Sequence, residues 1–204
     1  MRLVGGRRFA EMSHLSLRAV VCPMKIGLGC AEQSTMAERR IADLFHCSEE
    51  TYWSKLFFDE AYNKTLFLEE LRFESWNIVR SEENDRQILR TVDAVPRVGN
   101  LPMPIKKLIK NGAGYREESV FDKQTRRCTA TAIPRSLADR LRIKGVTSTE
   151  PVAEGRCNRV FTVSVKAEVF AVGGMLETLI LDDLQRIYAK AARFSNRWIA
   201  ERGL

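Results

Sequence analysis

The end of the chain constrains the fold most strongly, because a strand pattern there runs through two glycines into a long helix pattern. Apolar and polar residues alternate from Phe161 to Val169, which is typical of a strand with one buried face. After Gly173 and Gly174, apolar residues recur every three or four positions, at Leu176, Ile180, Leu184, Ile187, Ala191, Phe194 and Trp198. At about 100° per residue they lie within an arc of roughly 80°, on a helix about 45 Å long. Such a stripe needs a large apolar partner surface.

The preceding residues predict a series of short elements. We expect strands at residues 39–47, 72–80, 86–95, 115–121, 127–133, 140–145 and 161–169. Polar turns at 81–85 and 122–126 are typical of hairpins, and residues 150–155 form a gap rich in Pro, Gly and Glu. Ser48 and Asp59 are good helix N-caps, so two short helices should follow the first strand. One further helical turn is expected at 105–109.

This order of elements predicts an α+β fold. Consecutive strands joined by short turns imply an antiparallel sheet, here of about seven strands. The sheet should be curved and wrapped around the long C-terminal helix, because only that arrangement buries the whole apolar stripe. The two short helices after the first strand complete the predicted arrangement.

Length and charge predict one domain with an N-terminal tail. The 204 residues carry a net charge of +7, of which residues 1–35 contribute +3 from five basic and two acidic side chains. The remaining +4 is scattered, with no basic block longer than Lys106-Lys107, so a nucleic-acid partner is not expected. We expect residues 1–35 to be a disordered tail and residues 36–204 to form the domain. Met36 is a candidate start; alternatively, the first 35 residues are an organellar or export signal.

The five cysteines do not indicate a metal site or a disulfide framework. Cys22, Cys30, Cys47, Cys128 and Cys157 are odd in number and have no C-x-x-C spacing. We therefore expect free thiols in a reducing, cytoplasmic compartment, with an organellar or exported location as the alternative. No cofactor or metal is predicted. No segment has the ~18–20 continuous apolar residues of a membrane span, so stable membrane insertion is not expected.

The junction between the last strand and the helix resembles a known family. Residues 172–177 read Val-Gly-Gly-Met-Leu-Glu, which is similar to the Val-Gly-Gly-x-x-Glu junction of a bacterial domain of unknown function. That domain is a branch of the START-like (SRPBCC, helix-grip) superfamily, which includes the birch-pollen allergen family and polyketide cyclases. The resemblance covers roughly residues 36–204. It implies an apolar cavity between sheet and helix, but it does not supply the ligand.

If such a cavity exists, inward strand residues and the first half of the helix should line it. The candidate ligand-binding residues are Trp76, Tyr115, Phe121, Phe161, Val163, Val165, Met175, Leu176, Leu179, Ile180 and Leu184. For each of them, ordinary core packing is the alternative. Farther along the helix, Phe194 and Trp198 are expected to seal the core.

The junction residues have mechanical interpretations. A strand that turns sharply into a helix packed over the same sheet needs close backbone approach or a permissive φ, which Gly173 and Gly174 supply. Glu177 suits the positive N-terminal end of the helix and should cap free N–H groups there, or else form a polar anchor at the cavity mouth.

Catalytic machinery is not evident, and no catalytic residue is assigned. His46 is the only histidine in residues 36–204, so no Ser-His-Asp or Cys-His arrangement can be built. Four charged residues occupy strand positions from which they could face inward, namely Glu74, Arg90, Asp93 and Glu117. We expect them instead on the convex, solvated face of the sheet.

Two functions from different classes follow. The first is non-catalytic binding or transport of a hydrophobic small molecule, lipid-, sterol- or polyketide-like, between sheet and helix. The second is a cyclase/aromatase-type enzyme that uses the same cavity. Inward carboxylate, arginine and tyrosine side chains converging on one point would favour the enzyme, and an all-apolar lining the carrier. The oligomeric state is left open.

Overall fold

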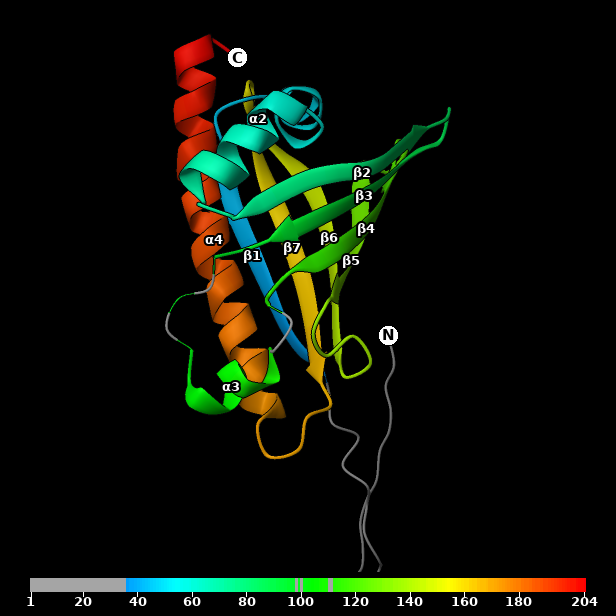
Figure 1. Cartoon of the computed structure of the whole chain (residues 1–204). Coiled ribbons are helices and arrows are strands. Elements are labelled where there is room, and N and C mark those ends of the chain that lie inside the picture. The colour runs from blue at the N-terminus through cyan, green and yellow to red at the C-terminus, as the bar shows by residue number, and fades with distance from the viewer. Residues whose placement is uncertain (1–35, 98, 100, 110–111) are drawn as a thin grey trace, which may run out of the picture. The chain divides into compact units, whose positions relative to one another are not determined.

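The computed structural model describes residues 36–97, 99, 101–109 and 112–204 (Figure 1). Its elements are β1 (Ala37–Phe45), α1 (Glu49–Thr51), η1 (Tyr52–Phe57), α2 (Glu60–Lys64), η2 (Thr65–Glu70), β2 (Ser75–Glu83), β3 (Gln87–Val95), α3 (Met103–Leu108), β4 (Tyr115–Asp122), β5 (Arg127–Pro134), β6 (Leu141–Ala153), β7 (Arg156–Ala167) and α4 (Gly173–Arg202). The predicted N-terminal tail, residues 1–35, lies outside the described residues.

The seven strands form one antiparallel sheet in the order β1-β7-β6-β5-β4-β3-β2. First and last strands are neighbours, with Ile41 opposite Phe161. The sheet curves, and α4 lies along its concave side against β1 and β7 (Figure 1). The predicted α+β helix-grip class is therefore confirmed, including the long C-terminal helix.

Both predicted short helices are present. The Ser48 hydroxyl accepts a hydrogen bond from the Thr51 backbone N–H (3.1 Å), and the Asp59 carboxylate accepts one from the Tyr62 N–H (2.6 Å), so each begins at its predicted cap. Each then widens into a π-helical turn, η1 and η2. The buried Asn63 side-chain amide donates to the carbonyl oxygens of residues 56, 57 and 59, which fixes the link between the two helices.

Several predicted strand boundaries were wrong, and three of the differences are the largest or have a clear physical reason. β6 continues through the expected gap to Ala153, because residues 149–153 pair with the start of β7 in a hairpin closed at Glu154-Gly155. β2 likewise extends to Glu83 through much of the predicted turn. β7 ends at Ala167 rather than Val169, because β6 begins opposite it at Leu141, and beyond this pair the Glu168 N–H donates to the Arg140 carbonyl oxygen (2.7 Å).

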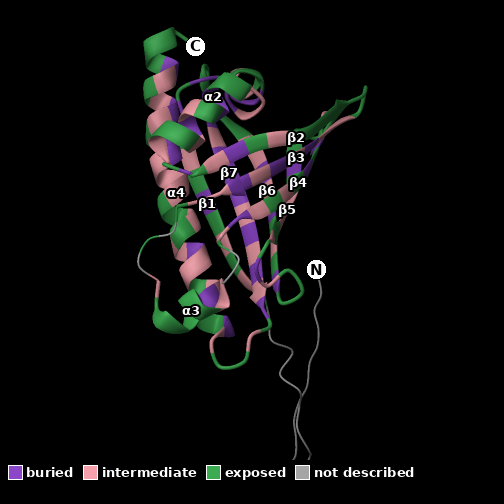
Figure 2. Cartoon of the chain, in the orientation of Figure 1, coloured by how far each residue is buried: buried purple, intermediate pink, exposed green. Residues whose placement is uncertain are grey.

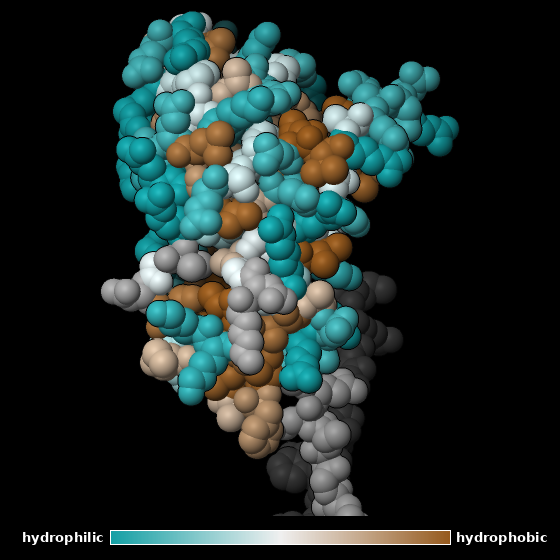
Figure 3. All heavy atoms as spheres, in the orientation of Figure 1, coloured by the Kyte–Doolittle hydropathy of each residue, from teal (hydrophilic) through white to brown (hydrophobic). Residues whose placement is uncertain are grey.

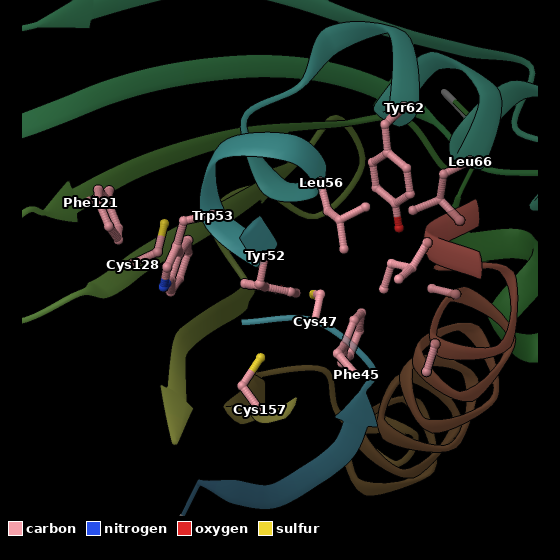
Figure 4. Packing of buried hydrophobic residues seen from close by; sticks show 13 residues of the cluster. Phe45, Cys47, Tyr52, Trp53, Leu56, Tyr62, Leu66, Phe121, Cys128 and Cys157 are labelled. Atoms are coloured by element: carbon pink, nitrogen blue, oxygen red, sulfur yellow. The ribbon is translucent and has the colours of Figure 1, made fainter. Parts of the chain in front are cut away.

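Within the described residues, the buried apolar side chains form three clusters. Figure 2 shows buried residues along the strands and on α4. One cluster joins the short helices to the C-terminal half of α4 (Figure 4), a second lies between β1, β7 and the N-terminal half of α4, and a third packs η2 on β2 and β3. Cys47, Cys128 and Cys157 are buried free thiols. These clusters surround, but do not fill, the space between sheet and helix.

Candidate functional site

A cavity of about 620 Å³ lies between the concave face of the sheet, the short helices and α4. Its wall is mostly apolar and takes side chains from β2 to β7, from η1 and η2, and from α4. Binding sites for small organic molecules typically have volumes of about 300–1,000 Å³ and such walls. The size and lining of this cavity therefore suit an apolar small molecule.

Most of the residues predicted from the sequence as ligand contacts lie on the cavity wall. These are Trp76, Tyr115, Phe161, Val163, Leu176, Leu179, Ile180 and Leu184. Three others lie outside it. Phe121 packs on Trp53 with ring centroids 4.5 Å apart, Val165 is fully buried in the second cluster, and Met175 is 47% exposed.

The apolar stripe of α4 divides into two parts. Leu176, Ile180, Leu184, Ile187 and Ala191 line the cavity, and this is why several of them are only half-buried. The last two stripe residues, Phe194 and Trp198, instead pack on Tyr62, at centroid distances of 5.8 and 5.5 Å. They close the end of the domain.

The absence of a side chain at Gly145 of β6 leaves space for the Phe161 ring on the cavity wall. A Cβ at this position would lie 2.5 Å from the Phe161 ring. The Phe161 ring occupies the space that a side chain at Gly145 would need, and it stacks on Tyr188 of α4, with centroids 4.3 Å apart and an interplanar angle of 15°. Sequence reasoning missed Tyr188, although it lies one helical turn after Leu184.

Two charged residues that we expected on the solvated face line the cavity instead. Arg90 is only 8% exposed, and Glu117 is half-buried on the adjacent strand. Arg90 pairs with Ser119 across the sheet, so Glu117 is its diagonal neighbour on the same face. The face of β3 was ambiguous in the sequence because its two sides are similarly apolar. The inward side includes Arg90, Val92 and Ala94.

The other two charged residues lie where we expected them, in contact with solvent. Asp93 forms an ion pair with Arg116 on the outer face of the sheet (2.8 Å), and Glu74 is exposed.

The Arg90 side chain is held by aromatic and backbone groups. Its Nη1 donates to the Phe57 carbonyl oxygen (2.9 Å), and its guanidinium lies 4.9 and 5.4 Å from the ring centroids of Phe57 and Phe58. The buried Nε atom has no hydrogen-bond partner among the described residues. No carboxylate in that part of the chain lies within ion-pair distance of Arg90.

Burial shifts the proton equilibria of the polar groups around Glu117. It raises the pKa of the Glu117 carboxyl, and the charge of Arg90 only partly opposes this effect. Burial also raises the pKa of Tyr115 and of Tyr188, so both hydroxyls stay protonated and can donate hydrogen bonds. A carboxyl, a guanidinium and two tyrosines thus interact electrostatically at one region of an otherwise apolar wall.

A second buried arginine, Arg159 of β7, has its charge compensated. It forms an ion pair with Asp43 of β1, with side-chain exposures of 8% and 15%, and lies 4.4 Å from the Tyr188 ring centroid. Continuing the alternation of Val163 and Phe161 backwards would have placed Arg159 on the inward face. No sequence feature marked Asp43 as its partner.

The exposed residues of the lining mark the cavity mouth. Arg97 and Gly99 follow β3, Gly112 precedes β4, and Asp183 and Arg186 lie one turn apart on α4, joined by an ion pair of 3.0 Å. The mouth therefore lies between the β3–β4 connection and α4. Hydrophobic residues are visible around α3 and the adjacent half of α4 on the face in Figure 3.

Gly173, Gly174 and Glu177 of the β7–α4 junction are not part of the cavity wall. A Cβ on Gly173 would collide with the Ala167 carbonyl oxygen, whereas the corresponding position on Gly174 is open. The expectation that Gly174 needs to be glycine was therefore wrong. The Glu177 carboxylate accepts a hydrogen bond from the Ala167 backbone N–H (2.8 Å), which ties the first turn of α4 to the end of β7. The left-handed residue of the turn is Ala171, with φ of 62°.

Within the described residues, no group of three or more His, Cys, Asp or Glu side chains is arranged to hold a metal ion. None of the helices in the same part of the chain is long and apolar enough to cross a membrane.

Solved structures share this architecture. TTHA0849 from Thermus thermophilus is similar with a TM-score of 0.60 and 18% identity, over 82% of this chain and 100% of that one. The Zhui aromatase/cyclase from Streptomyces sp. R1128 has a TM-score of 0.58 and 10% sequence identity, over 81% of this chain and 96% of that one. Norcoclaurine synthase from Thalictrum flavum, in complex with dopamine and hydroxybenzaldehyde, has a TM-score of 0.55 and 16% identity, over 91% of this chain and 98% of that one. At these identities the likeness shows the helix-grip fold alone.

Sequence comparison gives the family. No curated protein matches the chain. One family profile does, and its match extends from the last residue of β1 almost to the end of α4. Because residues 45–199 match the family described as "Protein of unknown function (DUF2505)", this protein belongs to the DUF2505 family.

Proposed function

We propose that this protein binds a hydrophobic small molecule, without chemical conversion, in the cavity between the sheet and α4. The observation that carries the proposal is the cavity itself, which measures about 620 Å³ and has a mostly apolar wall. Burying an apolar ligand there gains roughly 25 cal/mol per Å² of apolar surface, less the cost of immobilising the ligand. Lipid-, sterol- and polyketide-like molecules have suitable chemistry.

The proposed ligand contacts are the wall residues already predicted from the sequence, with Tyr188 added. Phe161 and Tyr188 form a stacked aromatic face, and Leu176, Ile180 and Leu184 form an aliphatic one. Phe121, Val165 and Met175 are left out, because they are not part of the wall.

A cavity-filling variant tests the proposal. Ala132 of β5 is half-buried and lines the cavity, so Ala132→Phe should extend its ring into open space. The affinity for a neutral apolar fluorescent probe should fall by at least roughly tenfold, or about 1.4 kcal/mol. Thr131→Phe, on the opposite face of the same strand, is the matched control and should bind normally. If the wild-type protein binds no apolar probe, the proposal is wrong.

Acid–base catalysis on the bound molecule is a second candidate, in the manner of a cyclase. The specific observation in its favour is the grouping of Glu117, Arg90, Tyr115 and Tyr188 on the wall. A buried carboxyl with a raised pKa is suited to exchange protons near neutral pH. Two fold relatives, an aromatase/cyclase and norcoclaurine synthase, are enzymes by name.

Hydrogen exchange distinguishes the two candidates. A long-chain methyl ketone bound in the cavity would lose α-protons to the Glu117 carboxylate in D2O, and deuterium uptake can be followed by mass spectrometry. The enzyme candidate predicts faster uptake with wild-type protein than with Glu117→Gln at equal ketone occupancy. Equal rates of deuterium uptake would contradict the enzyme candidate, and binding would be the remaining function.

A further inference from the structure

The cavity carries an uncompensated positive charge at Arg90. The two buried arginines of the wall differ in this respect, because Arg159 forms an ion pair with Asp43 whereas Arg90 has no carboxylate within ion-pair distance in the described part of the chain. Removing a charge from water without a partner is costly in free energy. Arg90 is therefore the group of the wall that gains most from a negatively charged neighbour.

Glu117 compensates Arg90 only weakly. Its carboxyl lies on the neighbouring strand, close enough for the guanidinium to act on it, but burial raises its pKa and so favours the neutral acid. With Glu117 protonated, this region presents the Arg90 charge and the hydroxyls of Tyr115 and Tyr188. Neither hydroxyl has a hydrogen-bond partner within the described residues.

The guanidinium also has donors to spare. An arginine has five N–H donors, and only the Nη1 bond to the Phe57 carbonyl oxygen is formed among the described residues. Arg90 is more than nine-tenths buried, its Nε has no hydrogen-bond partner among the described residues, and the residue lines the cavity. A planar fork of this kind matches a carboxylate, which can accept two parallel hydrogen bonds.

We propose that the ligand is an apolar molecule with one carboxylate, and that Arg90 binds this carboxylate inside the cavity. The inference rests on the proposed binding function and names its ligand class. One negative charge balances the buried, uncompensated charge of Arg90, whereas a doubly charged phosphate monoester would leave an excess negative charge in an apolar site.

The test compares a pyrene-labelled fatty acid with its methyl ester, which has the same chain but no charge. Wild-type protein should bind the acid at least roughly tenfold more tightly than the ester. Arg90→Met should abolish this preference. Methionine keeps the apolar stem against Phe57 and Phe58, and the Phe57 carbonyl oxygen still accepts a hydrogen bond from Asn63 (3.0 Å).

The control and a thermal melt separate recognition from folding. Arg80→Met makes the same substitution at a side chain 61% exposed on β2 and should retain the preference for the acid. Arg90→Met should melt at the wild-type temperature or above, because replacing an uncompensated buried charge by an apolar side chain is often neutral or stabilising. Should Arg90→Met not fold, Glu117→Gln tests the same point at about pH 8, where more of the competing carboxyl is ionised than at lower pH and its removal should raise the acid-to-ester affinity ratio.

The failures of the two proposals are distinguishable. Equal wild-type affinities for acid and ester, or a preference that survives in Arg90→Met, would overturn the carboxylate site and leave apolar binding intact. The same holds if Glu117→Gln leaves the ratio unchanged or lowers it. Failure of both probes to bind wild-type protein would overturn both proposals.

Discussion

Glu117 faces the cavity, while its chain neighbours Arg116 and Glu118 are exposed on the other face of β4. From the sequence, four alternating residues, Tyr115 to Phe121, could be assigned to one face. The charge of Glu117 argued for a solvated position, although Tyr115 and Phe121 on the same face were candidates for the cavity wall. Glu117 can face inward because the sheet closes around α4 and leaves an interior that is not completely packed. A polar side chain can lie there because part of it faces the cavity.

The raised pKa of Glu117 predicts a pH-dependent stability difference. A carboxyl whose pKa is higher in the folded state favours folding below its unfolded pKa, and this contribution is lost as pH rises through the folded value. Glu117→Gln should therefore gain stability over wild type as pH rises from about 4 to about 8. Urea unfolding at both pH values measures the change, with the exposed Glu118→Gln as control. A constant difference between variant and wild type would contradict the shift.

The ion pair of Arg159 and Asp43 predicts strong coupling at a second buried site. Asp43→Ala leaves the arginine charge uncompensated and should cost about 3 kcal/mol of unfolding free energy. Adding Arg159→Met should recover a large part of that loss, since the pair is then replaced by apolar groups. A double-mutant cycle by chemical denaturation measures the coupling. Strictly additive effects would mean that the pair does not interact.

At the scale of elements, the β7–α4 junction shows what local sequence could not assign. The glycine pair indicated a sharp turn, and the structure has one, but only Gly173 lies against backbone, at the Ala167 carbonyl oxygen. The left-handed conformation falls on Ala171, a residue type that gives no such signal. Which glycine is required depends on how the helix approaches the strand, and that is a tertiary feature.

The two glycines should therefore respond differently to the same substitution. Gly173→Ala should destabilise by more than about 1 kcal/mol, because its methyl group meets backbone that cannot move freely. Gly174→Ala should be neutral or stabilise by up to about 1 kcal/mol, because the position is open and alanine favours helix. Thermal or urea unfolding of the two variants decides between the positions; equal effects would contradict this assignment.

Elements with a regular spacing of apolar residues were predictable from the sequence, whereas strand ends that depend on pairing with a neighbouring strand were not. The stripe on α4 and the caps Ser48 and Asp59 act within one or two turns, so their sequence signals are local. The end of β7 and the continuation of β6 to Ala153 depend on which strand lies alongside, which composition does not show. The aromatic and aliphatic cavity wall followed from strand alternation and helix period, whereas the inward direction of Arg90 did not.

At the scale of the molecule, the fold leaves its centre incompletely packed. Three apolar clusters stabilise the two ends and one edge of the domain, and the stripe of α4 faces the remaining space. Interiors are normally close-packed, and empty volume forfeits dispersion contacts. A cavity of about 620 Å³ is consistent with selection for binding at some expense of stability.

Native mass spectrometry of the purified chain tests the central claim, ligand binding in this cavity, most directly. Mixed with a fatty acid, wild-type protein should form a complex with one bound molecule, and Ala132→Phe should form much less of it while Thr131→Phe behaves as wild type. The bound molecule should be released intact on collisional activation. The absence of any complex with wild-type protein, or equal complex formation by Ala132→Phe, would contradict binding between the sheet and α4.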